Sequence, residues 1–277
     1  YIPMANKKTA DLTPEEQHQK DLERLEKMRP IDDDFMRELF RNNIPLAQLV
    51  LRIMTGKNDL VITREETQYD LERLLGARSI CLDVFATDSK GQIFNLEIQR
   101  SNKGATPKRA RYHSSAIDVE FLKERQEFDK LPITYVIFVT ENDVRNNNRP
   151  VYTFERRDTL TGESFGDEEY IIFINGAYND PDDDSDLAKL IHDFGCNKAE
   201  DMYFDLMAER TNYYKKTPEG VSYMCKLMED MVNEEKIRLA GKLILRGKDT
   251  LEEIAELTGL TLEKVEEIAE EINHVSA

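Results

Sequence analysis

The amino-acid sequence predicts an α/β fold, in which a mixed β-sheet is flanked by helices and followed by an all-helical C-terminal region. Residues 133–140 (ITYVIFVT) form an unbroken apolar run, as expected of a central strand that is buried on both faces. Two shorter strand-like runs precede it and are joined by residues 88–91 (DSKG), which favour a hairpin turn. Beyond residue 186 the apolar residues recur only at helical spacing.

The composition indicates a folded protein with a strongly charged surface. Of the 277 residues, 40% are hydrophobic and 34% are charged, so the chain can bury a core. The length favours one large domain with a smaller appendage. The formal net charge of −17 argues against simple nucleic-acid binding, because polyanions are held by Lys and Arg. A nucleic-acid site therefore requires a local cluster of basic residues.

Cysteine spacing and hydropathy indicate a reducing environment without membrane contact. Cys81, Cys196 and Cys225 lie far apart, with no CxxC pair and no nearby histidine pair. Neither a disulfide framework nor a zinc site is indicated. No apolar stretch approaches the roughly 20 residues that cross a bilayer, and no basic segment followed by an apolar block opens the chain. We expect a cytoplasmic protein.

Three helices are predicted before the first strand. The first begins at Thr13 and Pro14, a capping residue followed by a proline that suits the first turn. The second spans residues 33–42, where three aspartates from residue 32 onward favour a helix N-terminus. The third carries apolar residues from Leu46 to Met54 at helical spacing and ends at Gly56.

The middle of the chain supplies the predicted sheet. Residues 59–71 are ambiguous, whereas residues 79–87 and 93–100 are predicted to form antiparallel neighbouring strands. A helix is expected over residues 107–128, and outer strands over residues 151–156 and 170–175. These elements give a predicted core of residues 31–178, preceded by a helical arm at residues 1–30.

The last hundred residues are predicted to be helical. An acidic linker at residues 179–186 separates them from the core, so the helical C-terminal region spans residues 187–277. Two short helices joined at Gly259 are expected within residues 250–273. This pair resembles a helix-turn-helix, but eight glutamates surround it, whereas a DNA-groove reader needs positive charge. We therefore favour a pairing or regulatory role, including a homo-oligomer formed through this region.

A pair of carboxylates is the main indication of chemistry. Side chains alternate along a strand, so Glu97 and Gln99 share one face, and Asp83 can reach that face if the hairpin pairs in register. Two adjacent carboxylates repel each other unless a cation neutralises them. Carboxylate oxygens suit Mg²⁺ or Mn²⁺, and such an ion supports phosphodiester hydrolysis. The bland alternative is an ordinary hairpin residue beside a solvent-facing glutamate.

The segments LDV (82–84) and LEIQ (96–99) resemble the Asp and Glu-x-Lys core of PD-(D/E)XK nucleases. Within that class, the chain resembles the PD-(D/E)XK nuclease family transposases, which are related to the recombination-promoting nucleases. The opening pattern is matched by Asp33, Met36, Arg37 and Phe40, and the following basic helix by residues 108–112. The resemblance spans roughly residues 30 to 215 and implies a restriction-endonuclease-like fold.

The resemblance also implies a set of site residues. Asp83, Glu97 and the Ile98 carbonyl would bind the metal, and Asp33 on the first core helix would complete the catalytic site. Asp34 and Glu38 are alternatives to Asp33. Gln99 stands where the family has lysine and would orient water or a phosphate oxygen. A glutamine is neither a cation nor a proton donor of lysine's kind, so catalysis is slower or depends more on metal.

A local cluster of basic residues meets the requirement set by the net charge. Five of them, without an intervening acid, precede Tyr112 and His113. On a helix, Lys108, Arg111, Tyr112 and Ser115 share a face that could hold a phosphate backbone. Alternatively, this is a solvated face. His113 is expected to be a packing or surface residue rather than a general base. The residues predicted to bind DNA are Arg100, Lys108, Arg109, Arg111 and Tyr112, and Lys103 belongs to the same cluster.

Three functions of different classes follow. The leading hypothesis is a magnesium-dependent DNA endonuclease linked to transposition or recombination. The second is a nuclease-fold module that binds nucleic acid or a protein partner with weak or no cleavage, because Gln99 replaces lysine. The third is self-association through the acidic helical tail. Cleavage assays, metal titration and oligomeric state distinguish the three.

Overall fold

The computed structural model describes residues 13–71, 81–100 and 104–275. Its internal contacts divide the chain into two compact units. The larger comprises Met28–Asn212, and the other combines Tyr1–Lys27 with Tyr213–Ala277. The boundary falls within helix α6 (Asp205–Lys216).

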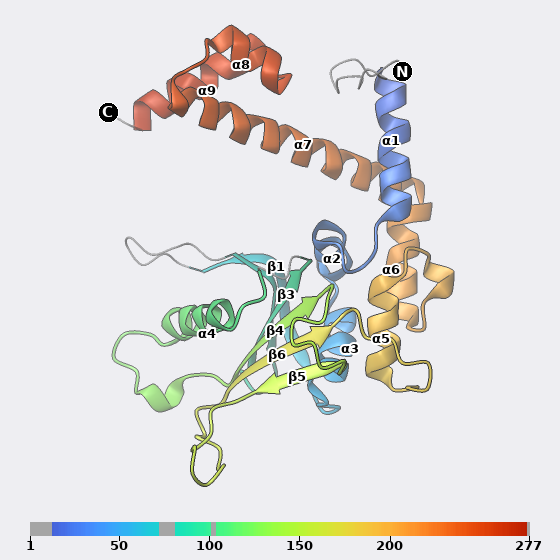
Figure 1. Ribbon diagram of the computed structural model, residues 1–277, viewed down its shortest axis with the longest axis vertical. Helices are drawn as coiled ribbons and strands as arrows, with labels where there is room; N and C mark the ends of the chain where they lie inside the picture. The colour runs from blue at the N-terminus through green and yellow to red at the C-terminus, as the bar shows by residue number, and fades with distance from the viewer. Residues whose placement is uncertain (1–12, 72–80, 101–103, 276–277) are drawn as a thin grey trace. The chain divides into compact units, whose positions relative to one another are not determined.

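The larger unit is built around a mixed sheet, which confirms the predicted α/β class (Figure 1). Within the described residues the strand order is β1-β2-β3-β4-β6-β5. Strands β3, β4 and β6 run parallel, and the other neighbours are antiparallel. The strands are β1 (Ile62–Asp70), β2 (Cys81–Asp88), β3 (Ile93–Gln99), β4 (Thr134–Thr140), β5 (Val151–Phe154) and β6 (Glu169–Asn175).

Strand β4 occupies the interior position predicted for it, and every one of its residues is buried. The prediction of two outer strands is confirmed only for β5, which lies at the edge of the sheet. Strand β6 lies between β4 and β5. Its apolar residues Ile172, Phe173 and Ile174 are buried, so an interior position suits them better than an edge.

The predicted hairpin of β2 and β3 is confirmed by antiparallel pairing. The Asp88 side chain accepts hydrogen bonds from the backbone N–H groups of Lys90 and Gln92, at 2.9 and 2.8 Å, which fixes the turn. Gly91 adopts φ 77°, a conformation that favours glycine. The ambiguous segment 59–71 contains β1, which pairs with β2. Residues 79–80 of the predicted strand lie outside the described residues.

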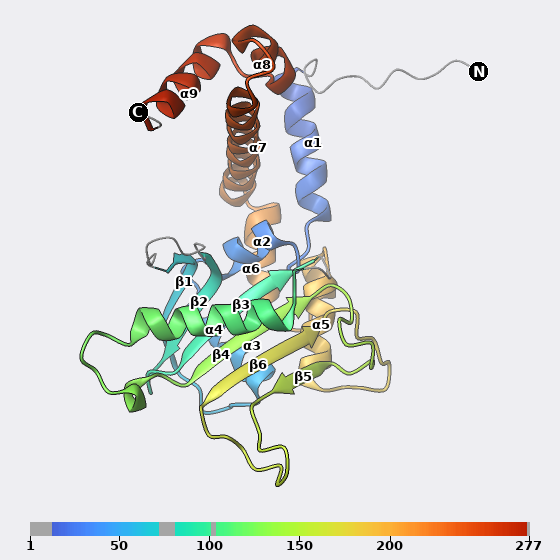
Figure 2. The same ribbon diagram turned by 60° about the vertical axis from the view of Figure 1, so that its left-hand side comes forward.

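Helices cover both faces of the sheet, as Figure 2 shows for α4 (Pro107–Phe121) on one face and α3 (Ile44–Thr55) on the other. Helix α2 (Asp33–Phe40) contacts β1, β2 and β3 and brings its acidic first turn to the sheet. Helix α3 ends at Gly56, as predicted, with φ 69°. The core beneath α4 includes Phe85, Ala110, Ile117, Val136 and Phe138.

Helix α4 is shorter than predicted, because the expected helix over residues 107–128 ends at Phe121. Leu122 turns to an extended conformation, and the Gln126 side chain accepts a hydrogen bond from the Lys123 backbone N–H at 2.7 Å. This side-chain bond replaces a helical one in a segment whose exposed residues gain nothing from packing. A short 3₁₀ turn, η2 (Phe128–Lys130), follows.

After the sheet, the acidic residues 180–184 form turns, and helix α5 (Asp186–Gly195) begins behind the capping residue Ser185. Helix α5 packs on α3, and Leu190, Ile191 and Phe194 are buried. A 3₁₀ turn, η3 (Ala199–Asp201), connects it to α6. The predicted division of the chain into four regions remains a prediction.

The other unit is helical. Helix α1 (Pro14–Lys27) starts where predicted, and Thr13 and Glu16 cap each other's backbone N–H groups. Helix α7 (Pro218–Arg246) contacts α1, α8 (Leu251–Thr258) and α9 (Leu262–Val275). Gly259 separates α8 and α9 with φ 67°, as predicted. Their shared core is Ala240, Ile254, Val265 and Ile268. Within the described residues, no helix combines the length and apolar character needed to cross a membrane.

Candidate functional site

The register of β2 and β3 places Asp83 beside Glu97. Val84 pairs with Leu96, so the preceding residue of β2 stands opposite the following residue of β3, and opposite residues of a pair share a face. The Asp83 backbone N–H donates to Glu97 Oε1 at 3.4 Å. The Ile98 backbone N–H donates to Asp83 Oδ2 at 3.0 Å. The two carboxylates that sequence alternation predicted to converge therefore interact across the hairpin.

Burial makes this pair electrostatically unfavourable without a cation. Glu97 is only 1% exposed. The pKa of Asp83 is raised to about 6, first by burial and second by the negative charge of Glu97. The Ile98 hydrogen bond and Arg37, whose Nε lies 3.6 Å from Asp83 Oδ1, lower the pKa of Asp83 and offset only part of this.

Asp33, on the first turn of α2, adds a third carboxylate. Its negative charge also raises the pKa of Asp83, so the two carboxylates are close enough to interact electrostatically. Burial is the largest cause of the raised pKa of Asp33 itself. Its Oδ1 atom is buried without a hydrogen-bond partner. An oxygen left in this state has a free coordination position and a desolvation cost that a cation would relieve.

The two alternatives to Asp33 are engaged elsewhere. Both carboxylate oxygens of Glu38 accept hydrogen bonds from Arg41, at 2.8 and 2.7 Å. Asp34 pairs with Arg37 at 3.4 Å. Among the three acidic side chains of α2, Asp33 therefore best suits a metal.

The donor set fits a hard divalent ion. Asp33, Asp83 and Glu97 offer carboxylate oxygens, which magnesium and manganese prefer. One of these oxygens lacks a hydrogen-bond partner, and burial together with the charge of Glu97 raises the pKa of Asp83 to about 6. Both features are relieved by the same cation.

Arg109 occupies a position that sequence analysis did not assign to it. Instead of pointing to solvent with the other basic residues of α4, its Nη1 donates to Gln99 Oε1 at 2.7 Å. Its Nη2 lies 3.3 Å from Glu97 Oε2. Gln99, which is neutral, stands at the family's lysine position. The Arg109 guanidinium therefore supplies a positive charge next to that position.

Gln99 is held in place from two sides. Its carbonyl oxygen accepts from Arg109, so its amide NH₂ remains available as a donor. On the other side lies Gly104, where an added Cβ would come within 1.9 Å of Gln99 Cδ. A residue larger than glycine at position 104 would therefore displace the amide.

His113 belongs to the same network. Its Nε2 accepts a hydrogen bond from Arg109 Nε at 3.3 Å, and its Nδ1 lies 3.4 Å from Glu97 Oε1 and 3.2 Å from Asn95 Nδ2. The histidine is 4% exposed. It packs against the site and orients Glu97, which combines the packing role expected of it with a polar one. The spacing Arg109–His113, four residues on a helix, is the signal that could have revealed both.

The remaining basic residues lie at the surface. Lys108, Arg111 and Tyr112 are exposed on α4, together with Ser115, which agrees with the shared face derived from helical periodicity. Arg100 is half-exposed and pairs with Asp32 at 3.3 Å and with Glu141 at 3.2 Å. Glu141, which also accepts from Arg29, carries no sequence signal that would have placed it here. Lys103 lies outside the described residues.

A family model described as PD-(D/E)XK nuclease family transposase matches residues 41–178. The match covers the whole sheet with Asp83, Glu97 and Gln99, whereas Asp33 precedes it. No curated protein and no solved structure gives a match. Together with the mixed sheet flanked by helices, the match confirms the predicted restriction-endonuclease-like fold.

Proposed function

We propose that this chain, which belongs to the PD-(D/E)XK nuclease family transposases, is a magnesium- or manganese-dependent endonuclease that hydrolyses DNA phosphodiester bonds in transposition or recombination. Nucleases of this family generally use divalent metal ions. The observation that carries the proposal is the convergence of Asp83 and Glu97, with the unpartnered oxygen of Asp33 beside them.

Asp33, Asp83 and Glu97 would hold the ion, and the Ile98 carbonyl is the further ligand that the family resemblance implies. A bound divalent ion supplies a Lewis acid and an acidified water. The protein contributes the preorganised carboxylates: the Ile98 N–H fixes Asp83, and His113 and Arg109 contact Glu97. Little reorganisation is then required when a substrate phosphate arrives.

Gln99 and Arg109 divide the work of the missing lysine. The Gln99 amide NH₂, oriented by Arg109, can donate to a phosphate oxygen or to the attacking water. The Arg109 guanidinium can stabilise the negative charge that develops on the phosphate. Because arginine stays protonated, it cannot donate the proton to the leaving oxygen. That proton must come from water.

The exposed side chains of α4 would position the substrate. Lys108 and Arg111 lie on the same helix as Arg109 and are free of intervening acidic neighbours in sequence. Contacts of this kind go to the phosphate backbone and carry little sequence information. DNA is thus the proposed partner, held by a local basic surface on an acidic protein.

The test compares the full chain with Asp83→Asn on plasmid DNA in Mg²⁺ and in Mn²⁺. We expect nicking or linearisation by the unaltered protein and none by the variant. The Glu65→Gln variant, which removes a buried carboxylate of β1, is the matched control and should cleave normally. Equal activity of the unaltered protein and Asp83→Asn would contradict the proposal.

A second function rests on Gln99, which leaves the site without the lysine of active family members. In this version the chain binds nucleic acid or a protein partner and cleaves weakly or not at all. Isothermal titration separates the two: metal binding that depends on Asp83 without DNA turnover supports the binding module. Rapid DNA cleavage would contradict the binding-module function.

A further inference from the structure

A second cluster of metal-binding side chains lies at the C-terminal end of α5, outside the nuclease site. His192, Asp193 and Cys196 each offer one ligand atom, and these atoms lie within 4.8 Å of one another. The three possible ligand atoms are therefore a nitrogen, an oxygen and a sulfur. No zinc site was predicted from the sequence, because the cysteines form no CxxC pair and have no histidine pair nearby.

The two separations that involve His192 suit tetrahedral coordination. With zinc bonds of about 2.3 Å to sulfur and about 2.0–2.1 Å to nitrogen and oxygen, tetrahedral ligand atoms lie roughly 3.3–3.6 Å apart. His192 Nδ1 lies 3.5 Å from Cys196 Sγ and 3.3 Å from Asp193 Oδ1. Residues four apart on a helix share a face, which brings His192 and Cys196 together.

Asp193 is fixed before any ion arrives. It is fully buried and accepts hydrogen bonds from the backbone N–H groups of Tyr203 and Phe204, at 2.8 and 2.9 Å. An ionised carboxylate has about four acceptor positions, so these bonds leave room for a metal. Hydrogen bonds from a surrounding shell are the usual means of orienting a metal ligand.

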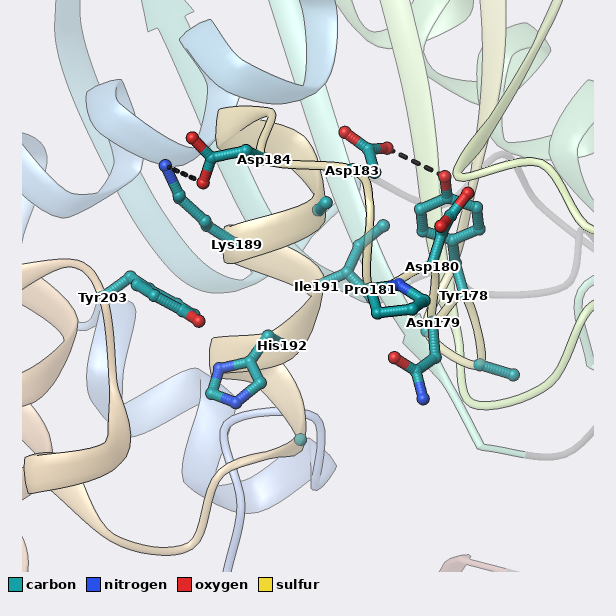
Figure 3. Close-up of a pocket in the computed structure, with 14 residues that line it drawn as sticks. Tyr178, Asn179, Asp180, Pro181, Asp183, Asp184, Lys189, Ile191, His192 and Tyr203 are labelled. Atoms are coloured by element: carbon teal, nitrogen blue, oxygen red, sulfur yellow. Dashed lines mark hydrogen bonds and ion pairs between the residues drawn. The ribbon is translucent and has the colours of Figure 1, made fainter.

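The cluster is accessible and electronegative. His192 is half-exposed and lines a hollow of about 420 Å³ beside residues 176–184, as Figure 3 shows, with the ring of Tyr203 directed toward it. Besides Asp193, the carboxylate of Asp201 lies close enough to act electrostatically on Cys196. The same negative charges favour a cation at this position.

We propose that His192 Nδ1, Asp193 Oδ1 and Cys196 Sγ bind a zinc ion, with water as the fourth ligand. A thiolate ligand selects zinc over magnesium, which prefers oxygen. As the zinc–sulfur bond forms, the thiol proton passes to solvent, so binding weakens at low pH. The ion would stabilise the C-terminal end of α5, independently of the nuclease site.

Cobalt titration of the full chain tests this proposal, because a thiolate bound to Co²⁺ gives a charge-transfer band in the near ultraviolet that an all-oxygen site lacks. We expect the band to saturate at one cobalt per chain and to be displaced by zinc. It should be lost in Cys196→Ala and retained in the matched variants Cys225→Ala and Cys81→Ala. In His192→Ala, whose half-exposed side chain can be removed without opening the core, zinc affinity should fall at least about tenfold.

Absence of the band in the unaltered chain overturns the proposal, and so does a band that survives in Cys196→Ala. Loss of the band in Cys81→Ala would assign it to the strand that carries Asp83. Circular dichroism of each variant checks folding. If Cys196→Ala unfolds, the zinc-dependent rise in melting temperature is compared in His192→Ala and the unaltered chain, and an equal rise in both also overturns the proposal. Because the readouts are spectroscopic and thermal, an inactive nuclease site leaves the result unchanged.

Discussion

Two acidic residues of the sheet, Glu65 and Asp83, both have a raised pKa but lie in different surroundings. Burial raises the pKa of Glu65 on β1 to about 7, and it raises the pKa of Asp83 on β2 to about 6. The Glu65 carboxylate accepts a backbone hydrogen bond from Asn43 at 3.2 Å, and its Oε1 atom is buried without a hydrogen-bond partner. Asp83 instead faces Glu97 and senses Asp33. A buried acid alone costs stability, whereas converging acids also create a place for a cation.

The largest expected effect separates the two regions by activity. Replacing Asp83 with Asn or Glu97 with Gln should lower DNA cleavage by about 10³-fold or more, because the metal loses a charged ligand. Glu65→Gln should leave the rate within about twofold. Rates of plasmid nicking in saturating Mn²⁺ measure both. A comparable loss of activity in Glu65→Gln would contradict a metal site specific to Asp83 and Glu97.

The same substitutions should increase the free energy of unfolding, and by similar amounts at Asp83 and at Glu65. In EDTA at pH 7.5, Asp83→Asn and Glu65→Gln should each stabilise the fold by up to about 3 kcal/mol, because a neutral side chain avoids the cost of a buried charge. Denaturant melts measure the gain. Only the stabilisation by added metal should be lost, and only in Asp83→Asn.

The pH dependence of these gains has a definite sign. A raised carboxyl pKa means that the folded state binds more protons than the unfolded state, so stability falls as pH rises between the two values. The windows are about pH 4 to 6 for Asp83 and about pH 4.5 to 7 for Glu65. Each variant's advantage should shrink toward pH 4. An advantage that grows on acidification would contradict the assignment.

Arg109 sharpens the account of the Asp83 region. We expect Arg109→Ala to reduce the cleavage rate about 10²-fold, because one electrostatic donor is removed from the site. The double variant Gln99→Lys with Arg109→Ala should recover much of that loss, since it restores a cation at the family position. Single-turnover assays compare the variants. No recovery, with unchanged folding and metal affinity, would limit Arg109 to holding Gln99 in place.

The exposed face of α4 should give smaller, salt-dependent effects. Lys108→Ala and Arg111→Ala should each weaken DNA binding several-fold and reduce the slope of log affinity against log salt by about one. Fluorescence anisotropy at several salt concentrations, with catalytically inactive Asp83→Asn, provides the measurement. Lys90→Ala, in the β2–β3 turn, is the control. Equal salt slopes in Asp83→Asn alone and with each of the three lysine or arginine substitutions would contradict DNA binding by this face of α4.

The smallest effect concerns the helical unit, for which we propose self-association. Leu245 and Leu257 are 71% and 63% exposed, so both apolar side chains are accessible to a second copy of the chain. Changing both to Glu should shift the full chain toward monomer in light scattering without altering cleavage per chain. An unchanged mass would dismiss the proposed oligomer.

The sequence predicted what depends on local pattern. Hairpin-turn chemistry at residues 88–91, alternation in β3 and the apolar run of β4 fixed the sheet around Asp83 and Glu97. It missed what depends on packing. Arg109 turns inward only because α4 packs on the sheet, and His192 contacts Tyr203 only after the chain returns from α5. The predicted end of α4 was also wrong, because the Lys123 backbone N–H donates to the Gln126 side chain instead of continuing the helix. Cytoplasmic location stays a prediction.

Helix α4 carries two kinds of side chain on opposite sides: Arg109 and His113 reach inward to Glu97, while Lys108 and Arg111 face outward. A rigid rod transmits any tilt to both sides at once. A duplex that pulls on the outer side would therefore also alter how strongly the inner guanidinium neutralises Glu97. DNA binding and the cleavage rate would then be coupled through α4, so a mutation that moves this helix would change both.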